Sequence, residues 1–274
     1  MPIHYDAIEP HIVLITIDRP ERKNALDLPH WRDLTNSWKR FRDDDDARVA
    51  IITGVKDCFC AGADLKNFIN KALEAANGQP IDLNNMEHME IDGIPFTVTM
   101  EGTLRTLPIY KPIIAAVGGP CVAGGIEMVG GTDIVVASPD AVFGVTEGKR
   151  GLFPGGGTTP RLPRQVPWRA AMELLLTADM ITAERALRLG LINDVVPKDQ
   201  LLERALQFAR SIAANGPIAM RAIKESALRG LWAGSQQEAY EIEAECVHPV
   251  TASADAMEGP LAFAQKRAPV WTGR

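Results

Sequence analysis

Two glutamates in turns rich in small residues are the side chains best placed to do chemistry. Glu127 closes the stretch AGGIE at residues 123–127, and Glu147 lies within GVTEGKRG at residues 144–151. Paired carboxylates in apolar surroundings can divide proton transfer between them, one ionised as a base and the other protonated as an acid. Glutamates are common, however, so this spacing alone does not establish a catalytic pair.

The turn before Glu127 can also supply a hydrogen-bond donor. Gly124 and Glu127 fall on the same side of the first turn of an expected helix, where backbone N–H groups lack internal partners. A second small-residue turn, CFCAGADLK at residues 58–66, could aim the N–H of Ala63 at the same point. Two such donors would stabilise negative charge on a carbonyl oxygen. A structural alternative remains, in which Glu127 only suits the positive end of the helix dipole.

The other glycine-rich and titratable motifs do not match known cofactor sites. The segment GGGTTP at residues 155–160 lacks the third glycine of a dinucleotide fingerprint, and GVTEGKR is too short for a phosphate-binding P-loop. No Gly-x-Ser-x-Gly elbow occurs. The five histidines and four cysteines have no metal-ligand spacing, so we expect no metal and reduced thiols.

Length and composition indicate an ordinary globular chain. Its 274 residues, 46% hydrophobic and 23% charged, suit one large domain or a domain with a helical appendage. The net charge of −6 argues against a nucleic-acid partner but not against a local basic cluster for a phosphorylated ligand. The chain has neither a signal-peptide pattern nor an apolar run of membrane-spanning length, so we expect a cytoplasmic protein with no membrane contact.

Strands and helices alternate along the first two thirds of the sequence, which favours an α/β core with parallel pairing. Strands are expected at residues 11–17, 49–53, 112–117, 133–137, 141–143 and 192–196. Helices are expected at residues 27–42, after residues 64, 124 and 158, and from 182 to 190. Four amphipathic helices follow, at residues 200–214, 217–231, 236–247 and 253–266. The Met-rich segment from 71 to 105 is expected to form helices and a loop, and it fits either an adaptable apolar lining or plain core packing.

Six motifs, in order, resemble the enoyl-CoA hydratase/isomerase (crotonase) family. They are DRP with NAL at residues 18–26, FCAGADLK at 59–66, AGGIE at 123–127, TE at 146–147, LFPGGGT at 152–158 and FAQKR at 263–267. The resemblance implies an α/β fold, a spiral of repeated β-β-α units over residues 1–197. It also implies that a helical region, residues 198–274, takes part in oligomerisation and completes the active site. Homotrimers, which often pair into hexamers, are the implied assembly.

The resemblance assigns roles to the residues singled out above. Ala63 and Gly124 hold the thioester oxygen, Glu127 acts as the base towards water, and Glu147 delivers the proton to C2 of the 2,3 double bond. The implied substrate is an acyl-CoA, so coenzyme A is part of the substrate and no separate cofactor is expected. The implied coenzyme A contacts are Arg22, Asn24, Ala25, Leu26, Ala61, Asp64, Leu65, Lys66, Phe263 and Lys266. A solvated surface role stays open for Arg22 and Lys66.

Three alternatives to an enoyl-CoA hydratase remain. An isomerase that shifts the double bond can work with Glu147 alone, although the presence of both glutamates disfavours it. A dehydratase of a hydroxyacyl or carnitinyl thioester performs the same chemistry in reverse. A non-catalytic relative that binds RNA would favour a basic helix, which this acidic chain does not show.

Two departures from the family pattern bear on specificity. Gly118-Gly119-Pro120 replaces a more usual asparagine-glycine turn before the Gly124 stretch. The segment from residue 67 to 110 is longer than in compact relatives. Since the family's acyl pocket borders this segment, we expect a bulky or unusual acyl group.

Overall fold

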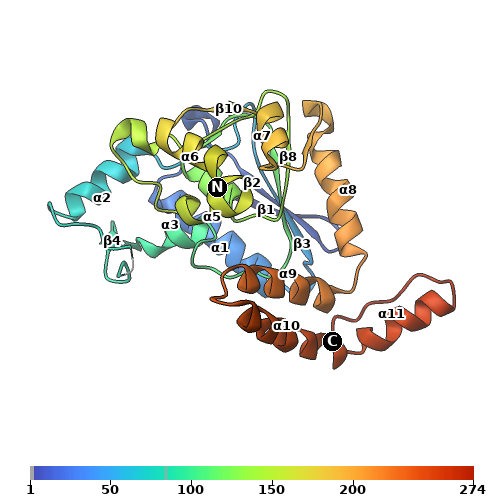
Figure 1. Cartoon of the computed structure of the whole chain (residues 1–274). Helices are drawn as coiled ribbons and strands as arrows, with labels where there is room; N and C mark the ends of the chain where they lie inside the picture. Colours follow the sequence, from blue (N-terminus) through green and yellow to red (C-terminus); the bar gives the residue numbers. More distant parts are fainter. Residues whose placement is uncertain (1–2, 84) are drawn as a thin grey trace.

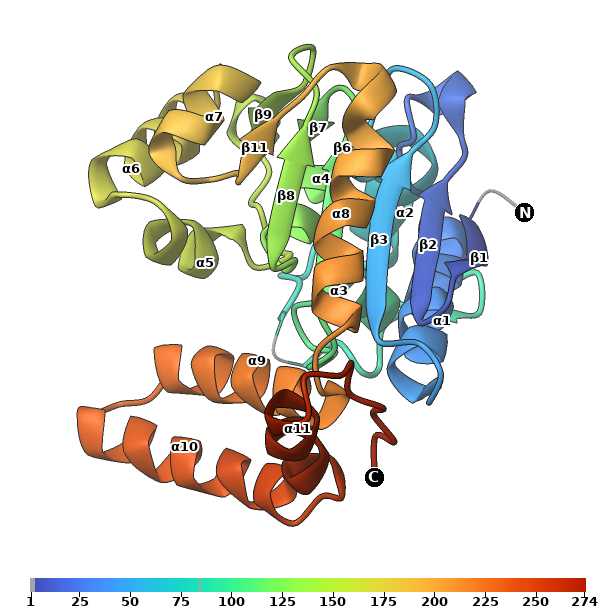
Figure 2. The ribbon, with the colours of Figure 1, turned by 90° about the vertical axis from the view of Figure 1, so that its right-hand side faces the viewer.

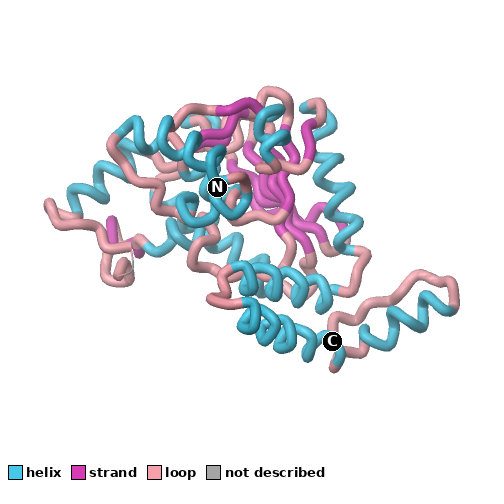
Figure 3. The backbone as a smooth tube through the Cα atoms, viewed as in Figure 1, coloured by secondary structure: helices cyan, strands magenta, loops and turns pink. Residues whose placement is uncertain are grey.

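A six-stranded sheet forms the centre of the computed structural model, which describes residues 3–83 and 85–274. Its order is β1-β2-β3-β6-β8-β11, and all pairs are parallel except β1–β2. The strands are β1 (Ile3–Glu9), β2 (Ile12–Ile17), β3 (Val49–Gly54), β6 (Ile113–Val117), β8 (Ile134–Ala137) and β11 (Asp194–Val195). The expected parallel core is therefore confirmed, whereas β1 was not predicted from the sequence. Figure 3 shows these strands gathered between helices.

The sheet is covered on both faces, which explains why β6 is a continuous apolar run with every residue buried. On one face α8 (Leu201–Ala213) covers the sheet and runs roughly along its strands (Figure 2). Its buried alanines, Ala205 and Ala209, lie one turn apart and pack against Ile51 and Ile114. The other face holds the larger core, which includes Trp38 and Phe41 of α1 (Leu28–Asp43).

A smaller sheet, β10-β9-β7, carries the Gly124 turn. It consists of β10 (Ile181–Thr182), β9 (Val142–Gly144) and β7 (Cys121–Val122), and α4 (Gly124–Val129) follows β7 directly. Between β6 and this helix the chain changes sheets at Gly118-Gly119-Pro120. A Cβ on Gly119 would lie 2.2 Å from the Asp57 carbonyl oxygen, so this crossing requires glycine.

Short elements surround the two sheets. They are η1 (Pro20–Arg22), η2 (Leu65–Ile69), α2 (Asn70–Ala75), β4 (Glu90–Ile91), β5 (Ile94–Pro95), α3 (Thr97–Gly102), η3 (Glu147–Arg150), α5 (Thr158–Gln165), α6 (Trp168–Thr177), α7 (Ala183–Leu189) and η4 (Lys198–Gln200). The β4–β5 hairpin lies in a segment where the sequence predicted only helices and a loop. Within the described residues, no helix is long and apolar enough to cross a membrane.

The last three helices, α9 (Pro217–Leu231), α10 (Gln236–Thr251) and α11 (Asp255–Ala264), stand apart from the two sheets (Figure 1). α9 and α10 pack against each other, while α11 projects away from the core. Large apolar side chains on these helices remain exposed, including Ile223, Tyr240, Met257 and Phe263.

Candidate active site

The two small-residue turns lie side by side. Cys60 and Cys121 form a parallel bridge, and the N–H of Val122 donates to the Cys60 carbonyl oxygen at 3.1 Å. A Cβ on Gly62 would lie 2.7 Å from the Gly124 nitrogen, so the absence of a side chain permits this approach. The structure therefore brings the turns of Ala63 and Gly124 together, although 60 residues separate them in the sequence.

Each turn presents one backbone N–H without an acceptor within the described part of the chain. Ala63 lies between two residues that form backbone hydrogen bonds with Leu26. The Leu26 N–H donates to the Gly62 carbonyl, and the Asp64 N–H donates to the Leu26 carbonyl, both at 2.8 Å. Gly124 is the first residue of α4, where no carbonyl lies one turn back along the helix. The two N–H groups are therefore available to a ligand oxygen.

Ala123 holds the Gly124 turn in a conformation that L-residues rarely adopt. Its φ is 51° and its ψ is −127°. Such backbone strain costs on the order of 1–3 kcal/mol and persists only where surrounding contacts impose it. One such contact is the hydrogen bond from the Ala123 N–H to the Gly144 carbonyl at 3.0 Å.

Glu127 is buried, with its carboxylate in a defined hydrogen-bonding environment. Its Oε1 accepts from the N–H of Gly156 at 2.6 Å and from the hydroxyl of Thr158 at 3.4 Å. Burial, followed by repulsion from Glu147, raises the pKa of Glu127 to about 7, and the two hydrogen bonds oppose this rise. The carboxyl group can therefore exchange a proton near neutral pH.

Glu147 begins η3 and is buried as well, but its surroundings differ. Its Oε2 has no hydrogen-bond partner among the described residues, and burial raises the pKa of the carboxyl group. Two neighbouring buried carboxyls cannot both ionise easily, so the pair favours holding one proton between them. The hydrogen bonds from Gly156 and Thr158 favour the ionised form of Glu127, whereas burial and repulsion from Glu147 favour its protonated form, so either carboxyl can hold the shared proton.

Both glutamates and both turns line one cavity of about 760 Å³. We call one side the glutamate wall; it consists of Gly124, Glu127, Glu147, Gly155 and Gly156. We call a second set of lining residues the apolar wall; it consists of Phe68, Ile69, Ala72, Leu73, Ile81, Leu83, Phe96, Thr99, Met100 and Thr103. An acid–base pair and two open N–H donors in a cavity that is also lined by apolar side chains suit proton transfer on a carbonyl compound with an apolar substituent.

Most residues predicted from the sequence lie on this cavity. The lining includes Arg22, Ala25, Ala61, Ala63, Asp64, Leu65, Lys66, Gly124, Glu127 and Glu147. Arg22 and Lys66 are exposed, which fits both a contact to a phosphate-bearing ligand and a solvated surface role. Asp64 has a structural task as well: it caps η2 and pairs with Arg19 at 3.1 Å.

Four predicted contacts do not reach the cavity within one chain. The Asn24 side chain is fully buried and donates to the Cys58 carbonyl at 2.6 Å, and Leu26 is also fully buried. Phe263 and Lys266 lie on or just after α11, where Phe263 is 87% exposed. A role for these two in coenzyme A binding stays a prediction that requires a neighbouring subunit.

Three further residues at the site were missed as functional residues in the sequence. Gly156 and Thr158 hold the Glu127 carboxylate, and Arg150 adds a third exposed cation to the lining. Gly155 and Gly156 of the glycine-rich turn also line the cavity. Only the tertiary fold shows the bond across 29 residues from Gly156 to Glu127.

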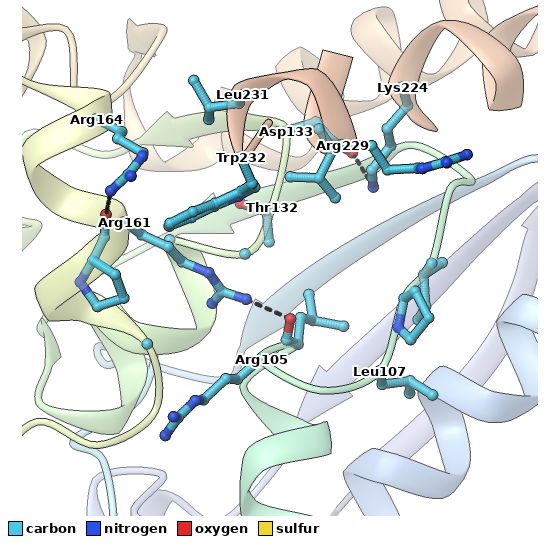
Figure 4. A pocket seen from close by; sticks show the side chains of 18 of the residues that line it. Arg105, Leu107, Thr132, Asp133, Arg161, Arg164, Lys224, Arg229, Leu231 and Trp232 are labelled. Carbon is cyan, nitrogen blue, oxygen red and sulfur yellow. Dashed lines mark hydrogen bonds and ion pairs between the residues drawn. The ribbon is translucent and has the colours of Figure 1, made fainter. Parts of the chain in front are cut away.

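A second cavity, of about 820 Å³, lies between α5 and the helices α9 and α10 (Figure 4). It contains none of the predicted site residues. Arg161, on its wall, donates to the carbonyls of Thr103 at 3.0 Å, Leu104, and Glu127 at 3.4 Å. Arg161 thus ties α4 to the segment after α3, and burial lowers the pKa of its guanidinium to about 10.

Within residues 3–83 and 85–274, no group of three or more His, Cys, Asp or Glu side chains is arranged to hold a metal ion.

Comparison with known proteins gives consistent matches over the whole chain. A sequence model described as enoyl-CoA hydratase/isomerase matches residues 7–274. The chain is 41% identical over 264 residues to enoyl-CoA hydratase EchA19 of Mycobacterium tuberculosis, covering 96% of this chain and 94% of that protein. It is 35% identical over 280 residues to (E)-benzylidenesuccinyl-CoA hydratase of Thauera aromatica, covering 100% of both. The crystal structure of an enoyl-CoA hydratase from Bacillus anthracis superposes with a TM-score of 0.87 at 32% identity, covering 100% of both chains.

Proposed function

The chain belongs to the enoyl-CoA hydratase/isomerase family, and from this premise we propose that it hydrates the 2,3 double bond of an enoyl-CoA thioester. The observation that carries the proposal is the meeting of Glu127 and Glu147 with the open N–H groups of Ala63 and Gly124 on one cavity. Hydration needs both an acid and a base beside an oxyanion site, and this cavity provides all three.

The first step develops negative charge on the thioester oxygen. The N–H groups of Ala63 and Gly124 hold that oxygen, and their fixed positions favour the enolate-like transition state over the neutral substrate. Removing one such donor typically costs about 3 kcal/mol of barrier.

The two glutamates then divide the elements of water. Ionised Glu127, held by Gly156 and Thr158, takes a proton from the water that attacks C3. Protonated Glu147 gives its proton to C2, and the enolate electrons return to form the new C–H bond. The proton gained by Glu127 and the proton lost by Glu147 balance over the cycle once the pair re-equilibrates through solvent.

Arg22, Lys66 and Arg150 form the basic rim that suits the phosphates of coenzyme A. Coenzyme A is part of the substrate in this proposal, and no further cofactor takes part. We also propose that residues 198–274 pack against neighbouring subunits in a trimer or hexamer, which would bury their exposed apolar side chains and bring Phe263 and Lys266 to an adjacent site.

The direct test is hydration of trans-2-enoyl-CoA thioesters, followed by the loss of enoyl absorbance, in the wild type and in Glu127→Gln. We expect turnover in the wild type and a loss of about 10²–10⁴-fold in the variant. Glu101→Gln is the matched control, because Glu101 pairs with Lys39 at 2.8 Å and does not line the cavity. Tight RNA binding without turnover of any enoyl thioester would overturn the proposal.

An isomerase and a dehydratase remain the rival functions within the family. Isomerisation would convert a 3-enoyl thioester without incorporating water, so ¹⁸O from labelled water would not appear in the product. Dehydration is the reverse of the proposed reaction, and one enzyme catalyses both the hydration of the enoyl thioester and the dehydration of the hydroxyacyl thioester.

A further inference from the structure

The chemistry of the apolar wall limits which acyl group the site can accept. Of its ten residues, eight are hydrocarbon or thioether side chains, and only Thr99 and Thr103 carry a polar atom. The charged residues that line the cavity are Arg22, Asp64, Lys66, Arg150 and the two glutamates. The apolar wall therefore faces the acyl group with no charged side chain of its own.

The two hydroxyl groups on this wall are already committed as donors. Thr99 donates to the Phe96 carbonyl at 2.8 Å, and Thr103 donates to the Met100 carbonyl at 3.1 Å. The nearby guanidinium of Arg105 donates to the Gly155 carbonyl behind the glutamate wall. A carboxylate at the far end of an acyl group would find no donor on this wall, and an unpaired charge there is costly to desolvate.

The cavity also has apolar surface in excess of what a short acyl group would cover. Phe153 and Leu73 line it and are 69% and 52% exposed. Phe68 and Phe96, which also line the cavity, form a tilted aromatic pair with ring centroids 5.5 Å apart. Exposed apolar residues along a cavity mark surface that a ligand covers.

Leu83 of the apolar wall and Gly155 of the glutamate wall lie close together. A Cβ on Gly155 would lie 3.2 Å from Cδ1 of Leu83, so the Leu83 side chain packs near the Gly155 backbone. We infer that the acyl group is bulky, apolar and uncharged, and that it extends from the glutamates along the apolar wall towards the Leu83–Gly155 contact. This inference rests on the proposed function in one respect, namely that the ligand is a coenzyme A thioester. The preference among acyl groups follows from the cavity lining alone.

The experiment compares four thioesters that share the trans-2 double bond: crotonyl-CoA, 2-octenoyl-CoA, a phenyl-bearing 2-pentenoyl-CoA, and an octenoyl-CoA whose far end is a carboxylate. We expect kcat/KM for the octenoyl and phenyl-bearing compounds to exceed that for crotonyl-CoA by about tenfold or more. The terminal carboxylate should lower kcat/KM by at least about tenfold relative to the octenoyl compound. Highest activity on crotonyl-CoA, or equal activity with and without the carboxylate, would overturn the inference.

Calorimetric binding of butyryl-CoA, octanoyl-CoA and its terminal-carboxylate analogue separates this inference from the proposed function, because saturated thioesters cannot be hydrated. Tighter binding of octanoyl-CoA by about tenfold supports the inference even where hydration fails. Equal binding of all three overturns the inference while leaving observed hydration intact.

Two variants of α2 test the same surface. Ala72 lines the cavity and is 2% exposed, so Ala72→Phe should lower the ratio of octenoyl to crotonyl kcat/KM by at least about tenfold. Ala75→Phe is the matched control, since Ala75 lies on the same helix, is exposed and does not line the cavity. Leu83→Ala is a second cavity variant, and it introduces no larger side chain. We expect it to raise the ratio of kcat/KM for the phenyl-bearing compound to kcat/KM for crotonyl-CoA. An unchanged ratio in both cavity variants contradicts the inference.

Discussion

The two walls of the cavity are held together by different interactions. On the glutamate wall, the Glu127 and Thr103 side chains lie so close to Gly156 that there is no room for a side chain there, and the Gly156 N–H and the Thr158 hydroxyl both donate to Oε1 of Glu127. On the apolar wall, neighbouring hydrocarbon side chains pack without specific partners. Hydrogen bonds on the glutamate wall fix the positions of the donor and acceptor atoms. Packing on the apolar wall depends on dispersion and buried area, so one side chain there can be replaced by another of similar size.

This difference separates reaction from substrate. A change on the glutamate wall alters where charge and protons lie in the transition state, so it should appear in kcat. A change on the apolar wall alters how much surface the acyl group buries in both ground and transition states, so it should appear in KM. Three of the four predictions below test that separation by kinetics, and the other tests how burial on the glutamate wall affects the ionisation of Glu127.

Glu147→Gln should produce the largest effect. The amide cannot deliver a proton, so we expect kcat for hydration to fall by about 10²–10⁴-fold. KM should change little, because the amide keeps the size of the side chain. Steady-state kinetics, with deuterium incorporation at C2 measured by mass spectrometry in heavy water, tests the assignment; a loss confined to KM would contradict it.

Gly156→Ala should reduce kcat without removing a titrating group. The new Cβ would lie 2.6 Å from Oε2 of Glu127 and 2.9 Å from Cγ2 of Thr103, so the carboxylate must move. A displacement of that size costs about tenfold to a hundredfold in rate. Gly230→Ala in α9, where the nearest atom would be 3.8 Å away, is the control and should keep wild-type activity. Wild-type kcat in Gly156→Ala would show that the position of the Glu127 carboxylate is not critical.

Glu127 should make the fold less stable as pH rises. Its folded pKa is raised from 4.5 to about 7, so ionisation opposes folding: stability is highest below about pH 4.5 and falls as pH rises towards about 7. Glu127→Gln removes this loss and should be more stable than the wild type by about 1–3 kcal/mol above pH 7, with little difference below pH 4.5. Urea unfolding across this pH range measures the difference, with exposed Glu241→Gln as the background. A constant difference at every pH would rule out a raised folded pKa.

Phe96→Leu on the apolar wall should have the smallest effect and a different kinetic signature. The smaller side chain buries less surface, so KM for 2-octenoyl-CoA should rise by about threefold to tenfold. The change in kcat should be smaller than the change in KM. Phe208→Leu in α8, which does not line the cavity, is the control. A larger effect on kcat than on KM would mean that the two walls are not separable.

Much of the fold follows from local pattern. Asp27 caps α1, and Thr182 and Gly190 bound α7, as the sequence predicts, because capping depends on residues within one turn. The apolar runs of β3 and β6 are equally local signals. The β1 strand was missed because its burial pattern is mixed, and it is defined by its pairing with β2 rather than by its own residues.

The candidate site divides in the same way. The sequence itself determined the residue types and the two small-residue turns, since glycine and alanine at these positions are what a close backbone approach permits. The tertiary structure decided that the turns of Ala63 and Gly124 meet, that Gly156 donates to Glu127, and that Oε2 of Glu147 has no partner among the described residues. These contacts join segments tens of residues apart. Burial, which sets the proton affinity of both glutamates, exists only after the sheets and helices have closed around them.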